Sequence, residues 1–226
     1  MDHPLDRPVW TALTTRQAPL ALGDGRALRF DPRYAAFGAA ADGAPESQAA
    51  LAALVPAEGT LWIVELGDTP PPPGPFASHA ALCHQMIAER LTPGETGFTV
   101  TPLTDADGPQ MLALATLTNP GPFFARTHRL GDFIGVKENG ALLAMAGERM
   151  RPTGFTEVSG VCTHPDHRGR GYAGALMRDV AARILARGET PFLHVYAANT
   201  GAIALYRALG FELRCEITAT VLSRVP

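Results

Sequence analysis

The chain has few cysteines, the residues that cross-link small secreted proteins, and little lysine. Its three cysteines, Cys83, Cys162 and Cys215, are far apart and form no C-x-x-C pair. This spacing argues against a disulfide framework and against a structural zinc site. Lysine is almost absent, with Lys137 alone, and the net charge is −3. The chain therefore has no global basic field that would attract DNA or an anionic membrane.

Long apolar runs are also missing, so no segment is predicted to cross a membrane. The N-terminus is acidic and interrupted by proline, unlike the basic and then apolar start of a secretory signal. We therefore expect a cytoplasmic protein with neither a membrane nor a nucleic acid as partner. The seven histidines and the carboxylates lack ligand spacing on one element, so no metal site is predicted. The richness in Ala, Gly, Pro and Arg is typical of a GC-rich bacterial genome.

The 226 residues, 46% of them hydrophobic, provide a core for one large domain or two small ones. A stretch rich in Thr, Pro and Gly at 92–97 divides the chain into an N-terminal region, 1–97, and a C-terminal domain, 98–226. In the N-terminal region we expect a helix over 46–54 and a strand over 61–66. No reactive constellation is recognisable there.

From residue 98 onward the sequence alternates between patterns of strands and helices. The predicted elements are a strand over 98–103, a helix over 105–117, a hairpin of 133–137 and 141–149, a strand over 156–163, a helix over 172–187, a strand over 192–196, a helix over 200–209 and a strand from 211 onward. Asn139-Gly140 indicates the hairpin because both residues tolerate a positive φ. In the last strand, strict alternation predicts one buried face from Phe211 to Val221. This order predicts a mixed α/β fold.

A glycine-rich turn lies between the strand over 156–163 and the helix over 172–187. Its sequence is His167-Arg168-Gly169-Arg170-Gly171-Tyr172-Ala173-Gly174. Glycines let the backbone turn tightly and approach a ligand, and free N–H groups at the start of the next helix favour an anion. The turn is therefore suited to a phosphate or pyrophosphate group.

Two common phosphate-binding motifs do not agree with this turn. A P-loop needs a lysine after its last glycine, and none follows here. The spacing of Gly169, Gly171 and Gly174 matches the dinucleotide fingerprint G-x-G-x-x-G. That fingerprint requires an acidic residue after the next strand, whereas the strand over 192–196 is followed by Ala197-Ala198-Asn199. A nicotinamide or flavin enzyme is therefore disfavoured.

Two segments resemble the signatures of the GNAT superfamily of N-acetyltransferases. Residues 161–173 resemble its acetyl-CoA motif [Q/R]-x-x-G-x-[G/A], with Arg168, Gly171 and Ala173 at the defined positions. Residues 199–211 resemble a second signature, N-x-x-A-x-x-L-Y-x-x-x-G-F. The resemblance covers 98–226, and within the superfamily the chain looks similar to the branch of glycine N-acyltransferases. It implies a mixed, mostly antiparallel sheet flanked by helices, and one interpretation of the N-terminal region is a degenerate copy of that fold.

The resemblance also implies which residues bind acetyl-CoA. The backbone of Val161 and Thr163 would pair with the amides of the pantetheine arm, and Asn199 would lie near the same arm. Cys162 stands between them, with its side chain on the opposite side of the strand. The pyrophosphate would be bound by the backbone of Arg168, Gly169, Arg170, Gly171, Tyr172, Ala173 and Gly174.

The resemblance implies direct transfer of an acetyl group from the thioester to an amine. Tyr206, two helical turns after Asn199, is the candidate acid that protonates the leaving CoA thiolate. Glu157 is the first candidate for the base that removes a proton from the amine, and Glu148 is the second. His164 and His194 are less favoured bases.

We therefore expect an acetyl-CoA-dependent N-acyltransferase that acts on a primary amine of a small molecule or an amino-acid-like acceptor. A CoA-binding sensor or scaffold without catalysis is the alternative. Phe123, Phe124, Arg126 and His128 lie where superfamily members often bind the acceptor, but they do not identify it. A homodimer remains open, because no heptad or exposed apolar stripe specifies one.

Overall fold

The fold is described from a computed structural model for residues 3–67 and 70–225. The helices are α1 (Pro8–Thr14), α2 (Pro45–Leu54), α3 (Gly108–Thr118), α4 (Tyr172–Ala186) and α5 (Thr200–Leu209). The strands are β1 (Ala21–Gly23), β2 (Ala27–Phe30), β3 (Gly38–Ala40), β4 (Leu61–Glu65), β5 (Phe76–Ile87), β6 (Thr101–Leu103), β7 (Phe133–Glu138), β8 (Ala141–Glu148), β9 (Phe155–Thr163), β10 (Thr190–Tyr196) and β11 (Glu212–Arg224).

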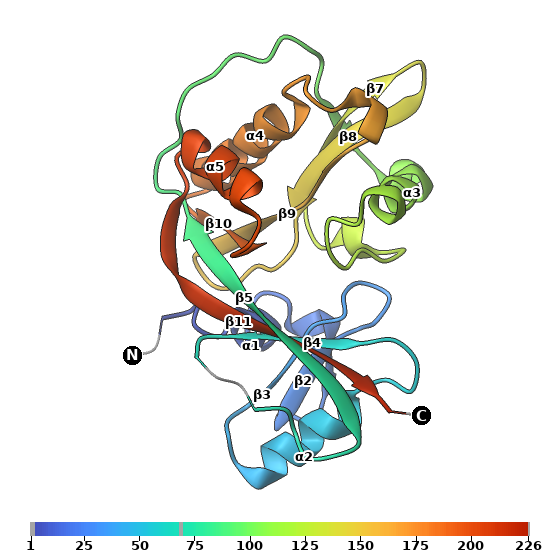
Figure 1. The fold of residues 1–226 in the computed structure, drawn as a ribbon, viewed down its shortest axis with the longest axis vertical. Coiled ribbons are helices and arrows are strands. Elements are labelled where there is room, and N and C mark those ends of the chain that lie inside the picture. Colours follow the sequence, from blue (N-terminus) through green and yellow to red (C-terminus); the bar gives the residue numbers. More distant parts are fainter. Residues whose placement is uncertain (1–2, 68–69, 226) are drawn as a thin grey trace.

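Most strands form one mixed sheet in the order β4-β11-β5-β10-β9-β8-β7-β6, and β1, β2 and β3 form a separate small sheet. Among the described residues, β9 and β10 are the only strands of the large sheet that pair in parallel. Helices α4 and α5 lie on one face of this sheet and α3 lies on the other (Figure 1). The expected mixed, mostly antiparallel sheet flanked by helices is therefore confirmed.

Alternating side chains of β8 explain why both faces of the sheet are covered. Ala144 and Ala146 pack in the core beneath α4, which buries Leu176 and Val180 there. Met145, between them, belongs to a second core, under α3. A strand that is apolar on both faces needs a helix on each side, and α3 and α4 provide them.

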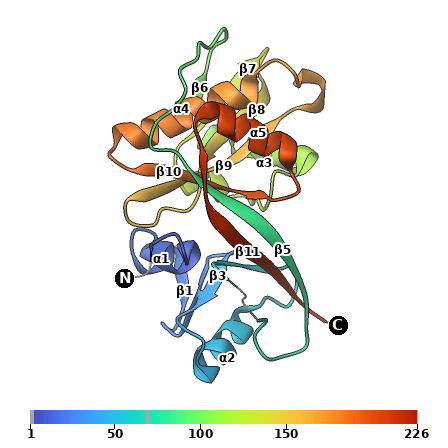
Figure 2. The ribbon, with the colours of Figure 1, turned by 60° about the vertical axis from the view of Figure 1, so that its left-hand side comes forward.

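The N-terminal region contributes two strands to the large sheet. β5 is inserted between β10 and β11 and pairs with β11 over the whole length from Phe76 to Ile87. β4 pairs with the far side of β11. In Figures 1 and 2 the long β5–β11 pair runs from the helices α4 and α5 toward the small sheet. The sheet thus crosses the sequence break at 92–97, and whether the N-terminal region is a degenerate copy of the fold stays a prediction.

Two predicted strands differ from the structure. The strand expected over 98–103 is shorter, because β6 begins at Thr101. In β11 a bulge between Leu213 and Cys215 shifts the register, so the expected strict alternation from Phe211 to Val221 is not kept. Leu213 is 44% exposed, although the alternation places it on the buried face. Farther along the strand, the consecutive residues Ala219 and Thr220 are both buried. The bulge and the packing of the N-terminal region against this strand explain the difference.

Candidate active site

A notch in the large sheet opens where β9 and β10 separate. The two strands pair only at their starts, where residues 155–157 face residues 190–192, and from there β10 continues along β5. A bulge at Gly160, which has a φ of +63°, bends β9 just past the separation. Side chains and backbone of the notch can therefore face a ligand instead of a neighbouring strand.

The residues expected beside the pantetheine arm lie on β9 at this notch. Val161 and Thr163 line a groove of about 820 Å³. The side chain of Cys162 packs into the core under α3 with Met111 and Met145. Burial raises the pKa of the Cys162 thiol to about 11, so it is a packed, protonated group and not an activated nucleophile.

The glycine-rich turn forms the opposite end of the groove. Gly169 and Gly171 have φ values of +77° and +78°, which only glycine adopts without strain. No side chain caps α4. Among the described residues, no backbone amide from Gly169 to Gly174 donates to a protein acceptor. The next amide, that of Ala175, donates to the Gly171 carbonyl at 3.2 Å. These free N–H groups at a helix N-terminus fit a pyrophosphate.

The structure brings most of the expected cofactor-binding residues to this one groove. Those that line it are Val161, Cys162, Thr163, Arg168, Gly169, Gly171, Tyr172, Ala173, Gly174 and Asn199. Arg170 is exposed and does not line the groove. A long groove that joins an anion-binding turn to a notch between strands fits the extended shape of a CoA molecule.

Asn199 and Tyr206 mark the point where this groove meets two other cavities. Asn199 caps α5, because its Oδ1 accepts from the Ala202 amide at 3.2 Å, and its NH₂ group stays available. Tyr206, two turns along the same helix, lines the groove and both other cavities. Burial raises the pKa of the Tyr206 phenol, so it stays protonated at neutral pH.

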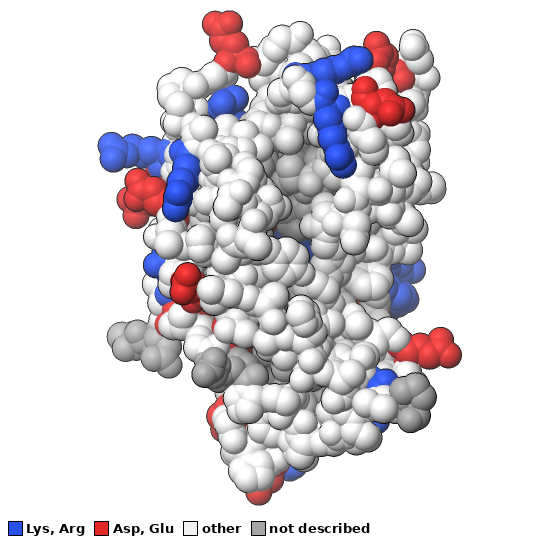
Figure 3. Space-filling model, in the orientation of Figure 1, with Lys and Arg blue, Asp and Glu red and all other residues white. Residues whose placement is uncertain are grey.

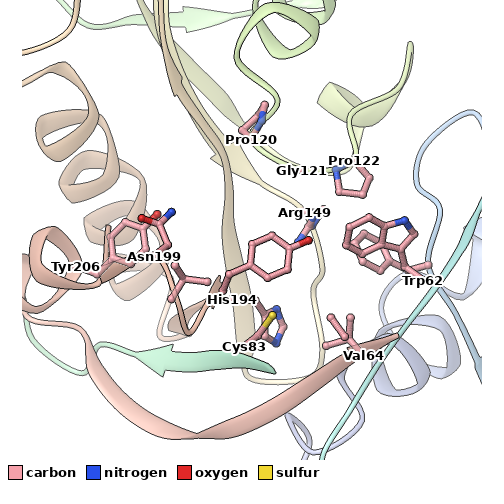
Figure 4. Close-up of a pocket in the computed structure, with 14 residues that line it drawn as sticks. Trp62, Val64, Cys83, Pro120, Gly121, Pro122, Arg149, His194, Asn199 and Tyr206 are labelled. Atoms are coloured by element: carbon pink, nitrogen blue, oxygen red, sulfur yellow. The ribbon is translucent and has the colours of Figure 1, made fainter. Parts of the chain in front are cut away.

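The first of these cavities, of about 150 Å³, lies between the two parts of the chain. Its walls include Phe37, Trp62, Val64 and Cys83 of the N-terminal region. In Figure 4, Tyr206 and Asn199 lie on one side of this cavity and Trp62 on the other. No local sequence pattern predicts that these residues lie here, because the pairing of β4 and β5 with β11 carries them there.

The second cavity, of about 630 Å³, is the wider opening beside the first. Phe123 and Phe124 line it, as expected for an acceptor region. Arg126 lies instead over the ring of Tyr34, and His128 pairs with Asp105. Two of the four residues expected near the acceptor are therefore at the opening, and two are held elsewhere.

Glu157 lies at the base of the notch but does not reach these cavities. It is 0% exposed, and its carboxylate accepts two hydrogen bonds of 2.8 Å from Arg149 and one of 2.8 Å from His194. Burial opposes its ionisation, but the charge and hydrogen bonds of Arg149 and the bond from His194 outweigh burial and lower its pKa to about 2. The expectation that Glu157 takes the amine's proton directly does not agree with this geometry, because such a base must be accessible and basic near neutral pH.

His194 is fixed in one tautomer by its neighbours. Arg214 Nη1 can only donate, so the Gln85 oxygen faces it at 2.6 Å. The Gln85 amide nitrogen therefore donates to the Leu5 carbonyl and to His194 Nε2, at 2.8 and 3.0 Å. It follows that His194 Nδ1 carries the hydrogen donated to Glu157. Both ring nitrogens are engaged, so His194 has no free lone pair for a substrate amine.

The remaining candidate bases lie outside the cavities. Glu148 is buried and accepts from Arg187 Nη2 at 2.6 Å. His164 accepts from the Asp166 amide at 3.3 Å, next to the glycine-rich turn. No Asp or Glu lines any of the three connected cavities in the described part of the chain. The site thus offers a proton donor, Tyr206, without a carboxylate base beside it.

Comparisons with known proteins identify the family. A family model described as FR47-like protein matches residues 133–221. A crystal structure of a protein from Novosphingobium aromaticivorans, described as an acetyltransferase of the GNAT family, is 46% identical over 100% of both chains, with a TM-score of 0.91. This chain belongs to the GNAT family. Membership of this family confirms the expected enzyme class, an N-acetyltransferase.

Two further GNAT relatives are more distant. The N-alpha-acetyltransferase RimI of Mycobacterium tuberculosis is 33% identical over 84 residues, which are 35% of this chain and 51% of the relative. The match thus spans about half the length of that protein. A GCN5-related N-acetyltransferase from Kribbella flavida shares the fold, with 17% identity, a TM-score of 0.62 and coverage of 96% and 95% of the two chains.

Two further observations on this GNAT chain concern membranes and metals. In residues 3–67 and 70–225 no helix is both long and apolar enough to cross a membrane. The same residues contain no group of three or more His, Cys, Asp or Glu arranged to hold a metal ion. Membership of the narrower glycine N-acyltransferase branch stays a prediction.

Proposed function

We propose that this protein is an acetyl-CoA-dependent N-acyltransferase that transfers an acetyl group directly to a primary amine of a small molecule. The observation that carries the proposal is the meeting of the 820 Å³ groove and the 150 Å³ cavity at Tyr206 and Asn199. One holds an extended, anionic donor and the other a small acceptor. A shared boundary of this kind supports a direct transfer, because it would let two bound substrates come into contact.

In this proposal the groove residues bind the donor. The Arg168 amide donates to the Pro165 carbonyl at 3.3 Å, so the amides from Gly169 to Gly174 hold the pyrophosphate. The backbone of Val161 and Thr163 pairs with the pantetheine amides. The Asn199 NH₂ group donates to the same arm. Acetyl-CoA supplies the thioester carbonyl that the amine attacks.

Tyr206 protonates the departing thiolate. Its raised pKa keeps the phenol in the protonated form that this role requires. Glu157, by contrast, acts as a positioning residue that fixes Arg149 and His194 at the edge of the acceptor cavity. The amine itself loses its proton to water, because no free base faces it among the described residues of the cavity lining.

This assignment predicts how the rate depends on pH. With two primary amines of different pKa, the rise of kcat/KM with pH should follow each amine's own pKa, because only the free amine attacks, and a fall at high pH should reflect the loss of the Tyr206 proton. Steady-state rates over a pH series with both amines measure this. A second ionisation near neutral pH, common to both amines, would reveal a base on the protein, and its loss in Glu157→Gln would return that role to Glu157.

Donor binding is tested first by calorimetric titration with acetyl-CoA, with NAD as the control ligand. We expect acetyl-CoA to bind and NAD not to bind, since no acidic residue follows β10 to hold the adenosine ribose of NAD. Binding of NAD alone would contradict the proposal. Binding of acetyl-CoA without thioester cleavage across a panel of amines would favour the alternative, a CoA-binding sensor or scaffold.

A further inference from the structure

The walls of the 150 Å³ cavity are mostly apolar, and several come from the N-terminal region. Trp62 and Val64 stand on β4, and Phe37 packs edge-on to Trp62 with ring centroids 6.2 Å apart. The indole N–H of Trp62 donates to Thr60 Oγ1 at 3.0 Å. Its polar group is therefore satisfied, and the rest of the ring can line the cavity. Apolar cavities of roughly this volume bind molecules the size of benzene.

The polar groups at this cavity carry no net charge that would favour a second cation. The positive charge of Arg149 is paired with Glu157, and its guanidinium lies 4.5 Å from the centre of the Phe37 ring. His194 also faces the carboxylate of Glu157 through its Nδ1, at 2.8 Å. Figure 3 shows a hollow near the middle of the molecule, bordered mainly by uncharged residues. An ammonium group bound deep in this cavity would lack an anionic partner, which is costly.

We propose that the acceptor is an apolar primary monoamine and that Trp62 of the N-terminal region is a specificity-determining residue. The hydrocarbon part of the amine packs against Trp62, Val64 and Phe37, and its nitrogen points toward Tyr206 and Asn199. The inference rests on the proposed function and deepens it. It assigns to the N-terminal region a direct part in choosing the acceptor.

The charge argument is tested with hexylamine and 1,6-diaminohexane, which differ by one terminal ammonium group. We expect kcat/KM for hexylamine to exceed that for the diamine by about tenfold or more, after correction for the diamine's two equivalent amines, because the second ammonium would be buried without a partner. Equal or higher kcat/KM for the diamine would overturn the inference.

The role of Trp62 is tested with Trp62→Ala and with Trp10→Ala as its control. Trp10 is the chain's other tryptophan, lies in α1 with Arg7 over its ring, and does not line the cavity. We expect Trp62→Ala to raise the KM for hexylamine about tenfold and to leave the Kd for acetyl-CoA unchanged. Trp10→Ala should change neither constant. An unchanged KM in a folded Trp62→Ala protein would overturn the assignment.

A second measurement does not depend on the stability of Trp62→Ala. In Trp10→Phe, Trp62 is the remaining tryptophan, so its fluorescence reports on the cavity. With CoA present, hexylamine should shift the emission to the blue as it replaces water, whereas the diamine at equal concentration should not. No shift with hexylamine would overturn the inference.

The two proposals fail in different ways. If acetyl-CoA neither binds nor is cleaved, the proposed function fails. If acetyl-CoA binds and is cleaved with the diamine as the better acceptor, only the inference about the acceptor fails.

Discussion

Replacing Tyr206 with phenylalanine is expected to lower kcat by about 100-fold or more, the range found for loss of a general acid. Tyr206 borders both the donor groove and the acceptor cavity, and its raised pKa keeps a proton available for the leaving thiolate. The substitution removes only the hydroxyl group, so the ring still packs against Phe211. The Kd for acetyl-CoA should therefore stay within about twofold, since catalysis by a proton donor acts on the transition state.

Stopped-flow or steady-state detection of free thiol measures this effect, with Tyr34→Phe as a matched control. Tyr34 belongs to the N-terminal region, lies against Arg126 and lines none of the three cavities. The control should keep its full rate. The wild-type kcat should also fall at high pH, as Tyr206 loses its proton above its usual pKa of about 10. A Tyr206→Phe protein with full kcat would show that the thiolate leaves without this acid.

The donor side of the site could be predicted because its determinants are local in sequence. The glycines at 169, 171 and 174 and the motif from Asn199 to Phe211 are each contained in one turn or one helix. The residue types of such short segments predict their backbone conformation, since a positive φ favours glycine and certain residues cap helices. The structure brings these segments to one groove.

The acceptor side could not be predicted because it depends on pairing between distant segments. Residues 76–87 contain Ser, His and Ala without clear alternation, so β5 gave no strand signal. Trp62 and Cys83 reach the cavity only because β4 and β5 pair on either side of β11. Register between strands far apart in the chain is a tertiary property that one sequence pattern does not encode.

The dependence on distant segments also explains why Glu157 was expected to act as a base. A carboxylate on a central strand near the notch was visible in the sequence, but its partners were not. Arg149 follows β8, and His194 stands on β10, two residues past Phe192, where the parallel pairing of β10 with β9 ends. Gln85 and Arg214 then extend this chain of hydrogen bonds across β5 and β11 to Asp6. The polar network ties the N-terminal region to the centre of the sheet.

Replacing Glu157 with glutamine is therefore expected to destabilise the fold strongly. The substitution keeps the shape of the side chain but leaves the Arg149 guanidinium, which is 12% exposed, without its counter-charge. Breaking a buried ion pair by removing one partner costs about 3–5 kcal/mol. Asp179→Asn is the control, because it removes an exposed pair with Arg183 on α4 that is worth at most about 0.5 kcal/mol. Urea unfolding of both variants measures the difference.

The pH dependence of the free energy of unfolding tests whether the ionised form of Glu157 stabilises the fold. The pKa of Glu157 is about 2 in the folded protein against an ordinary value of 4.5, so the folded state favours the ionised form. This contribution is fully present above pH 4.5 and is lost as the pH falls toward 2. It amounts to about 3 kcal/mol, at 1.36 kcal/mol per pKa unit. Glu157→Gln should therefore lose less stability than the wild type between pH 5 and pH 2, and an equal loss in both proteins would show that Glu157 is not held as an ion.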